Sequence, residues 1–382
     1  MRVLVFMPRN MRFGPSNASS VDLCVRDLIA ASRYRQSTTV VCCQNETLFP
    51  GLKIETYPLD VDAHKSRKVA FAIAQASKAS ADLVVVQQHL PTAAALARRV
   101  AAPVILHKHN MTRPIAKDGL LSGVRRNWRL RQYGSLAGII FVSNACRAAF
   151  RRDWPEVQTP SSIVYNGLDF TEWRPSRDPA NEIICVGRAA PEKGIREAAL
   201  AIATVLAVKK SWRARLVLSE AKRFPGYLNV VLATIRPLAA RVTVEYDLPL
   251  SSVRQRCQNA AIAIVPSKWE EPFGRTALEA HASGCAVISS SSGGLPEVNG
   301  DNALALPEGF NCTDIAACVE RLIEYPGLRM KLAQQGRAYC LEKFPISRVA
   351  TSADDFYDRI IRSREDLRSS KEERAEWIES DI

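Results

Sequence analysis

The chain has 382 residues, of which 47% are hydrophobic and 24% charged, and its formal net charge at pH 7 is +13. This length exceeds what one hydrophobic core usually organises, so we expect a globular protein of two domains. No apolar run reaches 18 residues, no signal-peptide layout opens the chain, and the ten cysteines show no C-x-x-C spacing. We therefore expect a cytoplasmic protein without a transmembrane helix, a zinc site or a disulfide framework.

Short apolar runs alternate with helical patterns along the first half of the chain. The first run spans residues 2–7, a helical pattern opens at Ser19, and later runs lie at 39–42, 83–86, 104–106, 138–142 and 162–164. This alternation predicts a doubly wound parallel sheet of the α/β class. The loop of residues 10–19 carries Gly14 and follows the first strand, at the kind of strand end where open parallel sheets bind ligands. It lacks G-x-G-x-x-G, so the dinucleotide fingerprint is absent.

The second half repeats this pattern. A helix is predicted at 195–209, and apolar runs lie at 183–186, 216–218, 242–244, 262–265 and 286–288. Residues 169–181, which mix proline and charge, join the two halves, so we expect domains at 1–170 and 171–346. A helical segment then begins at residue 347 and ends in a charged tail at residue 382.

The positive charge is concentrated in the first half. Residues 1–175 contain 24 Lys and Arg against 12 Asp and Glu, whereas residues 176–382 contain 28 against 27. Such a field favours an anionic partner. A phosphorylated acceptor, an anionic lipid surface and nucleic acid are all candidates on this ground.

Two cations and a helix start point to an anion site in the second half. Arg188 and Lys193 follow the strand at 183–186 and precede the predicted helix. They could neutralise a diphosphate whose negative charge grows as it departs, although an ordinary solvated loop would also look like this. Gly274 precedes a helix predicted from Thr276 on, and the first backbone N–H groups of a helix attract anions. Together the two features favour a functional site over a solvated loop.

Two carboxylates flank this helix start. Glu279 lies one turn inside the helix, where it can accept hydrogen bonds from two hydroxyl groups, as acidic residues do from a ribose. Glu271 precedes the turn and could hold hydroxyl groups of a sugar, while its neighbour Glu270 is predicted to be solvated. The alternative for Glu279 is an ordinary surface glutamate on a helix.

The order of the motifs is more specific than any one of them. It reads Val142-Ser143-Asn144, Tyr165-Asn166-Gly167-Leu168-Asp169, Gly187-Arg188, Lys193-Gly194, Pro266-Ser267, Glu271-Pro272-Phe273-Gly274, Leu278-Glu279-Ala280, Gly284 and Gly293-Gly294-Leu295-Pro296-Glu297. This order resembles the retaining glycosyltransferases of family 4, strongly at 140–300 and weakly before residue 100. The resemblance implies a GT-B architecture, in which two Rossmann-like domains face a cleft and the second binds a nucleotide-sugar. It also implies that the helix at 347–382 crosses back to the first domain.

The resemblance implies roles for single residues of the second half. Arg188 and Lys193 match the pair that binds the pyrophosphate, Glu279 matches the ribose carboxylate, and Glu271 matches the carboxylate near the donor sugar. The loop and helix start that meet the phosphate and the sugar correspond to Phe273, Gly274, Arg275 and Thr276. The family usually has an aliphatic residue at position 275, so Arg275 adds a cation that either selects an acidic donor or strengthens phosphate binding.

The resemblance also reaches the first half. His109 matches a cleft histidine that hydrogen-bonds the donor sugar. His107 shares its side of an extended strand and is the alternative, and a satisfied histidine at a strand end is the non-functional one. Gly14 is assigned to the donor site by its place in the first loop. That loop lacks the family's Gly-Gly, so acceptor contacts are not carried over.

A basic amphipathic helix is predicted at 119–133. Its apolar face holds Leu120, Leu121, Val124 and Trp128, and around this face lie Arg125, Arg126, Arg129 and Arg131. Such a helix either rests on an anionic membrane or is a domain helix whose arginines are solvated.

From these observations we expect a retaining glycosyltransferase of the hexosyltransferase type that needs no metal. It would move a sugar from a nucleoside diphosphate to a glycan or lipid-linked acceptor, such as a lipopolysaccharide core or another surface polysaccharide, from the cytoplasm or the inner face of the membrane. A sugar-nucleotide epimerase of the same architecture is the alternative. A basic nucleic-acid-binding protein is less favoured, because the chain shows no nucleic-acid-binding motif and no aromatic platform.

Overall fold

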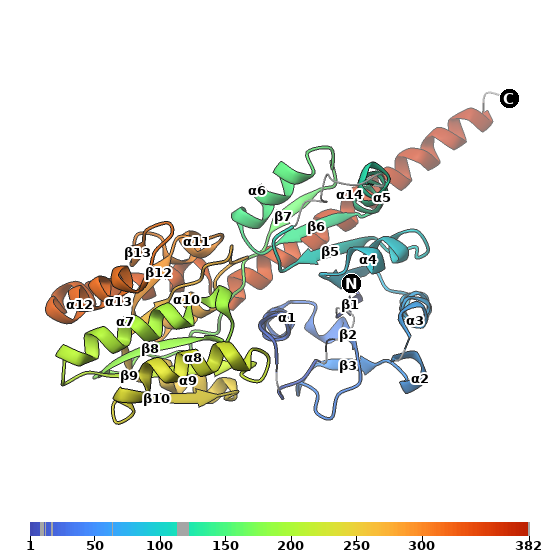
Figure 1. Cartoon of the computed structure of the whole chain (residues 1–382). Coiled ribbons are helices and arrows are strands. Elements are labelled where there is room, and N and C mark those ends of the chain that lie inside the picture. Colours follow the sequence, from blue (N-terminus) through green and yellow to red (C-terminus); the bar gives the residue numbers. More distant parts are fainter. Residues whose placement is uncertain (8–10, 12, 17, 63, 113–121, 381–382) are drawn as a thin grey trace. The chain divides into compact units, whose positions relative to one another are not determined.

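The computed structural model describes residues 1–380 with the exception of 8–10, 12, 17, 63 and 113–121 (Figure 1). The chain divides into two compact units. Unit 1 comprises Met1–Val142, Arg147–Tyr165 and Ile346–Ile382, and unit 2 comprises Ser143–Cys146 and Asn166–Pro345. Unit 2 thus begins a few residues before the boundary expected from the sequence, and it includes a four-residue segment that no sequence feature indicated.

Unit 1 is built on a seven-stranded parallel sheet with the strand order β3-β2-β1-β4-β5-β6-β7 (Figure 1). Its strands are β1 (Val3–Phe6), β2 (Thr38–Cys42), β3 (Lys53–Thr56), β4 (Leu83–Gln87), β5 (Val104–Lys108), β6 (Gly138–Phe141) and β7 (Ser161–Ile163). Its helices are α1 (Ser20–Ala31), α2 (Leu59–Asp62), α3 (Lys65–Lys78), α4 (Leu90–Ala97), α5 (Ser122–Gly134), α6 (Asn144–Asp153), whose first three residues belong to unit 2, and α14 (Ile346–Ser380).

The central strands of unit 1 are buried along their whole length. Every residue of β1, β4, β5 and β6 is buried, so side chains on both faces of the sheet are covered. This explains the continuous apolar runs in the sequence, since a parallel sheet covered on both faces has no solvated side to alternate with.

The last helix, α14, packs within unit 1. Asp354 accepts hydrogen bonds from the Ser32 hydroxyl at 2.7 Å and from the Arg33 backbone N–H at 2.9 Å. Gly138 on β6 leaves room for the ring of Phe356, because a Cβ atom there would lie 2.9 Å from the Phe356 Cζ atom. The part of α14 up to Ile360 therefore belongs to the core of unit 1.

Unit 2 is built on a six-stranded parallel sheet with the order β10-β9-β8-β11-β12-β13. Its strands are β8 (Ala180–Arg188), β9 (Arg213–Ser219), β10 (Val242–Tyr246), β11 (Ala260–Val265), β12 (Ala286–Ser290) and β13 (Ala303–Leu306). Its helices are α7 (Ile195–Val208), α8 (Pro225–Ile235), α9 (Leu250–Asn259), α10 (Arg275–Ala282), α11 (Leu295–Asn299), α12 (Cys312–Glu324) and α13 (Pro326–Lys343).

A glycine brings α13 close to α10 in unit 2. A Cβ atom at Gly336 would overlap Nδ1 of His281, whose ring is fully buried. The other ring nitrogen, Nε2, lies 3.1 Å from Oδ1 of Asn299. Burial lowers the pKa of His281 to about 4, and the Asn299 contact opposes this only in part, so the imidazole is neutral at pH 7.

The prediction of doubly wound parallel sheets is confirmed in both units. Strands β3 and β13 were not predicted, and both lie at an edge of their sheet. β3 has no fully buried residue, and β13 consists of Ala and Leu, which favour helices. Within the described ranges, no helix combines the length and the apolar character needed to cross a bilayer.

Candidate functional site

The candidate site of unit 2 lies where the strand order reverses. The chain proceeds from β8 outward to β10 and then returns to β11 on the other side of β8. The carboxyl ends of β8 and β11 are therefore adjacent, and ligands of open parallel sheets bind at such a point. The site residues predicted in the second half lie at the end of β8, in the loops that leave these two strands, and in helix α10, which follows the second loop.

These two loops are packed directly against each other. Gly194 has φ +65°, and a Cβ atom at this position would overlap the carbonyl oxygen of Pro266. The backbone N–H of Lys268 donates to the carbonyl of Glu192 at 2.9 Å. Gly194 is therefore required both for the left-handed turn and for the approach of the second loop.

Lys193 and Glu271 meet across these loops. The Lys193 ammonium forms an ion pair with the Glu271 carboxylate, and their side chains are 19% and 13% exposed. The ammonium also lies 5.9 Å from the ring centroid of Trp269. Glu270, by contrast, is exposed. The structure therefore brings together two of the predicted residues and leaves the neighbouring glutamate in solvent.

Arg188 is the last residue of β8, whereas the sequence placed it in the following turn. Its guanidinium lies 3.1 Å from the carboxylate of Glu192 and 3.9 Å from that of Glu220. The side chain is 30% exposed, so it can exchange these carboxylates for a bound anion. This places a second cation at the carboxyl edge of the sheet.

The start of α10 lies at the same edge. Gly274 precedes the helix with φ +111°, and no side chain caps the first turn. A Cβ atom at Gly274 would lie 2.5 Å from Leu295 Cδ2, and this contact adds to the preference for glycine that the positive φ sets. Phe273 is buried and packs edge-on against Phe344 at a centroid distance of 5.4 Å, while Thr276 is half-buried. The first turn of α10 therefore leaves its backbone N–H groups without a side-chain cap, which is the feature from which an anion site was expected.

Two glycines hold the backbone of the Glu271 loop. A Cβ atom at Gly293, which has φ +62°, would overlap the backbone oxygen of Glu271. The N–H of Gly294 donates to this same oxygen at 2.7 Å. The Gly293-Gly294 pair therefore fixes the position from which the Glu271 side chain extends.

The segment Ser143–Cys146 holds this loop from another side within unit 2. The Ser143 hydroxyl donates to the Pro272 carbonyl at 2.6 Å, and the Cys146 thiol lies 3.3 Å from the same oxygen. The Glu297 carboxylate accepts from the backbone N–H groups of Asn144 and Ala145, both at 2.8 Å. In the sequence, Ser143 and Glu297 appear only as landmarks of the resemblance. The position of Ser143 directly before α6 is the one local signal that could have identified it as a helix cap.

Arg275 and Glu279 form a second ion pair on α10. The Arg275 Nε atom donates to Glu279 Oε1 at 2.8 Å, and the side chains are only 8% and 9% exposed. Residues four apart share one face of a helix, which explains the contact. The cation that departs from the family pattern is therefore directed along the helix to the predicted ribose carboxylate.

In unit 1, His109 follows β5 directly and is buried. Its Nε2 atom lies 2.7 Å from Oε1 of Gln87, and its ring stacks on His107 with the centroids 4.2 Å apart. Burial lowers the pKa of His109 well below its ordinary value, and the charges of His107 and Lys108 add to this effect. Burial lowers the pKa of His107 to about 3. Both imidazoles are therefore neutral at pH 7, and His109 can act as a hydrogen-bonding group but not as a cation.

Gly14 of unit 1 is buried in a loop contact. A Cβ atom there would overlap the backbone oxygen of Thr47 and the side-chain amide of Asn45. The packing of the loop alone therefore explains why glycine is required at this position.

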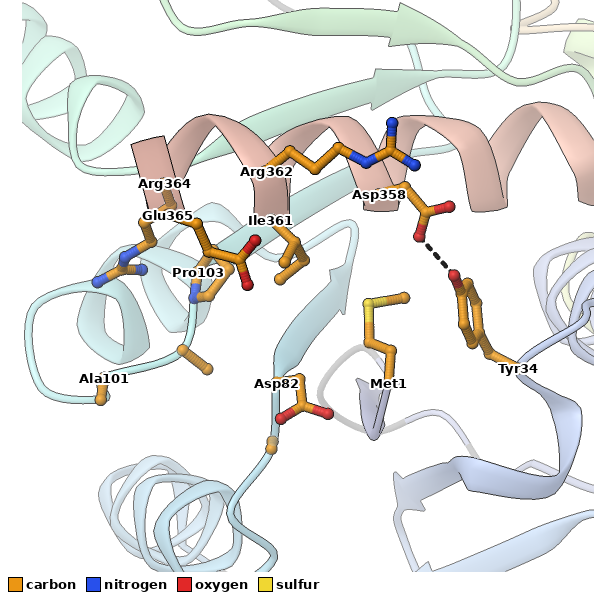
Figure 2. A pocket seen from close by; sticks show the side chains of 12 residues that line it. Met1, Tyr34, Asp82, Ala101, Pro103, Asp358, Ile361, Arg362, Arg364 and Glu365 are labelled. Carbon is orange, nitrogen blue, oxygen red and sulfur yellow. Dashed lines mark hydrogen bonds between the residues drawn. The ribbon is translucent and has the colours of Figure 1, made fainter. Parts of the chain in front are cut away.

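A cavity of about 620 Å³ lies at the opposite, amino-terminal edge of the unit 1 sheet (Figure 2). Met1, Asp82 and Pro103, each close to the start of a strand, line it together with residues of α14. The Tyr34 hydroxyl donates to Asp358 at its rim. None of the predicted site residues lines this cavity, and parallel sheets bind ligands at the other edge. Among the described residues, no cluster of three or more His, Cys, Asp or Glu side chains could hold a metal ion.

Two family models match the chain in succession. The model described as Glycosyltransferase Family 4 matches residues 24–172, and the model described as Glycosyl transferases group 1 matches residues 170–339. The chain belongs to the family 4 glycosyltransferases. It is an enzyme of the hexosyltransferase type with a GT-B fold. This assignment decides against the epimerase and the nucleic-acid-binding protein as its primary function.

Related proteins and structures agree with the family. Alpha-maltose-1-phosphate synthase of Mycolicibacterium smegmatis is 26% identical over 289 residues, which cover 68% of this chain and 73% of that protein. The structure of sucrose-phosphate synthase of Thermosynechococcus elongatus aligns with a TM-score of 0.74 at 17% identity, and the alignment covers 95% of this chain and 100% of the synthase chain. The structure of HepE of Anabaena, solved with UDP and glucose, aligns with a TM-score of 0.73 at 19% identity, and the alignment covers 93% of this chain and 99% of the HepE chain. At these identities the two structures show the fold that this glycosyltransferase shares.

Proposed function

We propose that this glycosyltransferase retains the configuration of the donor sugar, needs no metal ion, and transfers a hexose from a nucleoside diphosphate to a lipid-linked glycan. A lipopolysaccharide core or another cell-surface polysaccharide is the proposed acceptor class, and the cytoplasmic face of the membrane is the proposed location. The observation that carries the donor half is the meeting of Lys193 and Glu271 at the carboxyl edge of the unit 2 sheet, where Arg188 and the start of α10 also lie.

In the proposed reaction, the bond between the sugar C1 atom and the diphosphate oxygen breaks while C1 bonds to the acceptor oxygen on the same face. The departing diphosphate takes the acceptor proton. Arg188, Lys193 and the first N–H groups of α10 stabilise its charge, in the place that a divalent cation takes in other enzymes. Glu271 holds hydroxyl groups of the sugar and Glu279 those of the ribose. His109 is neutral, so its contribution is a hydrogen bond to the sugar.

The donor half is tested by thermal unfolding with UDP, ADP, GDP and their glucose forms. A ligand that binds the folded state raises its stability by about 2.7 kcal/mol at a hundred times its Kd. We expect one base to raise the melting temperature with EDTA present. If no nucleotide raises it, the donor assignment fails; if only metal-supplemented samples respond, the metal-independent mechanism fails. The anomeric configuration of the product, read by NMR, tests retention.

The acceptor is proposed from the charge of the first half of the chain, with 24 Lys and Arg against 12 Asp and Glu in residues 1–175. Such a surface favours phosphorylated glycans. Because a relative is named for making a sugar phosphate, a small soluble sugar phosphate is the second candidate acceptor. Once the donor is known, labelled sugar should enter phosphorylated lipid-linked core oligosaccharide faster than glucose 1-phosphate. Faster transfer to glucose 1-phosphate would instead make the small sugar phosphate the favoured acceptor.

A basic face of α5 supports the membrane location. Val124 and Trp128 are 65% and 52% exposed, and the Arg129 guanidinium lies 5.8 Å from the Trp128 ring centroid. Arg125 is exposed. An exposed aromatic side chain among arginines is suited to the interface of an anionic bilayer. The predicted residues Leu120 and Leu121 lie outside the described residues.

One arginine of the predicted basic face belongs instead to the fold. Arg126 bonds Glu156 at 2.7 Å and the Asp153 carbonyl at 3.1 Å, and it lies 4.8 Å from the Trp154 ring centroid. A membrane test should therefore leave Arg126 in place, since its loss would disturb the domain.

Sedimentation with liposomes tests the proposed surface. We expect retention on phosphatidylglycerol vesicles at low salt, and its loss when Arg125, Trp128 and Arg129 are all changed to Ser. Removal of two exposed arginines of unit 2, Arg177→Ser and Arg321→Ser, is the control and should leave retention unchanged. Equal retention of both variants would show that α5 does not dock.

A further inference from the structure

Arg275 and Glu279 form a buried ion pair at the start of α10. Arg275 donates to Glu279 at 2.8 Å, and both side chains are more than nine-tenths buried. A buried carboxylate is destabilised unless a partner compensates its charge. The guanidinium supplies this compensation, and its planar donor geometry also limits the conformations of the flexible glutamate side chain.

The positions of the two ion pairs show which part of a donor Arg275 acts on. Glu271, the carboxylate assigned to the donor sugar, lies before α10 and is paired with Lys193. Arg275 is the first residue of α10, and its Nε atom is directed one turn along the helix to Glu279. The extra cation is therefore joined to the carboxylate assigned to the nucleoside, not to the one assigned to the sugar.

We propose that Arg275 is a positioning residue that holds Glu279 in the orientation needed to accept hydrogen bonds from the ribose hydroxyl groups of the donor. By this action Arg275 sets how strongly the enzyme distinguishes a ribonucleoside diphosphate from one that lacks those hydroxyl groups. The proposal rests on the proposed function, and it excludes a role for Arg275 in the selection of an acidic sugar.

A second effect follows from charge. Glu279 is negative and would repel a diphosphate bound at the start of the same helix. The adjacent guanidinium offsets this repulsion, so loss of Arg275 should weaken the binding of every nucleoside diphosphate as well as the preference for ribose. The positioning role is therefore measured by the ratio of the affinity for the ribose form to the affinity for the form without ribose hydroxyl groups, and not by either affinity alone.

The experiment measures calorimetric affinities of UDP, ADP and GDP, and then of the 2′,3′-dideoxy form of the base that binds. For the wild type we expect a preference for the ribose form of about tenfold or more, as hydrogen bonds to a charged group give. In Arg275→Leu the preference should fall to about threefold or less. Glu279→Gln should reduce it as well, and Arg275→Leu should then reduce it no further, because the two residues act through one contact.

Two further variants keep the test decisive. Arg275→Lys retains a cation but not the planar donor group, and we expect an intermediate preference; it also carries the test if Arg275→Leu does not fold, which thermal unfolding without ligand will show. Arg321→Leu removes an exposed arginine of unit 2 and should keep the wild-type preference.

Three results would overturn the proposal. An undiminished ribose preference in folded Arg275→Leu or Arg275→Lys would show that Arg275 does not act through Glu279. A selective loss of binding to nucleoside-diphosphate uronic acids would assign Arg275 to the sugar instead. Failure of the wild type to bind any of the three ribonucleotides would remove the proposed function itself, and this inference with it.

Discussion

Lys193 and Glu271 form an ion pair although 78 positions separate them in the sequence. Each comes from a different loop, and the two loops are held together by the contact of Gly194 with Pro266 and by the hydrogen bond from the Lys268 N–H to the Glu192 carbonyl. The pair places an ammonium, suited to a diphosphate, beside a carboxylate, suited to sugar hydroxyl groups, at a spacing set by the backbone. In the proposed function, this contact joins the group assigned to the diphosphate with the group assigned to the sugar.

Replacement of Lys193 by Ala should reduce kcat by about a hundredfold to a thousandfold, the range observed when one group that stabilises a developing oxyanion is removed. Because the lysine side chain is only 19% exposed and its loss leaves Glu271 unpaired, thermal unfolding must first show that the variant is folded. Lys209→Ala is the matched control, since Lys209 pairs with Glu324 at 2.7 Å in the same unit. Steady-state kinetics with the identified donor provide the measurement, and equal activities of the two variants would remove Lys193 from the reaction.

Glu271 and Glu270 offer a test on adjacent residues. Glu271→Gln removes a charge that is paired with Lys193, whereas Glu270→Gln changes an exposed side chain. We expect Glu271→Gln to lower kcat/KM by at least a hundredfold and Glu270→Gln to stay within about twofold of the wild type. If both variants retain activity, the sugar is held by other groups.

A comparison of Ala substitutions at Gly293 and Gly309 distinguishes the cost of a strained backbone from the cost of a steric clash. Both have positive φ values, 62° and 70° respectively, but a Cβ atom overlaps the Glu271 backbone only at position 293 and meets nothing within 4 Å at position 309. Gly309→Ala should cost about 1–2 kcal/mol of unfolding free energy from the left-handed conformation alone. Gly293→Ala should cost roughly 1–3 kcal/mol more and should also impair catalysis, because Glu271 moves. Urea unfolding and kinetics check both effects, and equal costs would contradict the overlap.

The buried His281 should make the stability of unit 2 depend on pH. Its pKa falls to about 4 in the folded protein from an ordinary value of 6.5. Between these values the unfolded chain binds a proton that the folded chain does not, so stability is complete above pH 6.5 and decreases as the pH falls towards 4. The total loss is about 3 kcal/mol, of which roughly 2 kcal/mol falls between pH 6.5 and 5.

His281→Gln removes the titration while it keeps a polar side chain. In urea unfolding, the decrease in stability from pH 7 to pH 5 should be smaller by roughly 2 kcal/mol in this variant than in the wild type. The comparison uses differences within each protein, so an overall destabilisation of the variant does not affect it. An unchanged pH dependence would show that folding does not lower the pKa of His281.

The residues that follow strand ends could be predicted from the sequence because the signal is local. Arg188, Lys193, Glu271 and Glu279 stand beside apolar runs and helix starts, and the parallel sheet brings those ends to one edge. The choice of Glu271 over Glu270 as the less solvated carboxylate agrees with their burial. The assignment of their roles in catalysis remains a prediction.

Contacts between distant segments could not be predicted in this way. The bonds of Ser143 and Cys146 to the Pro272 carbonyl join residues more than 120 positions apart, and no periodicity records such a contact. The direction of the Arg275 side chain was likewise undecided, because an arginine at a helix start can turn outward to a ligand or along the helix. Only the position of Glu279 one turn later, together with the burial of both side chains, settles it.

The close approach of α13 to α10 at Gly336 bears on how this enzyme can change over evolutionary time. Position 336 carries no chemistry, yet any side chain there meets the ring of His281, two residues beyond the carboxylate assigned to the ribose. Sequence drift at this position is therefore coupled to position 281: a larger residue at 336 requires a smaller one at 281. Among related enzymes the two positions should vary together, and a glycine kept at 336 is evidence of a crowded helix crossing and not of a further catalytic group.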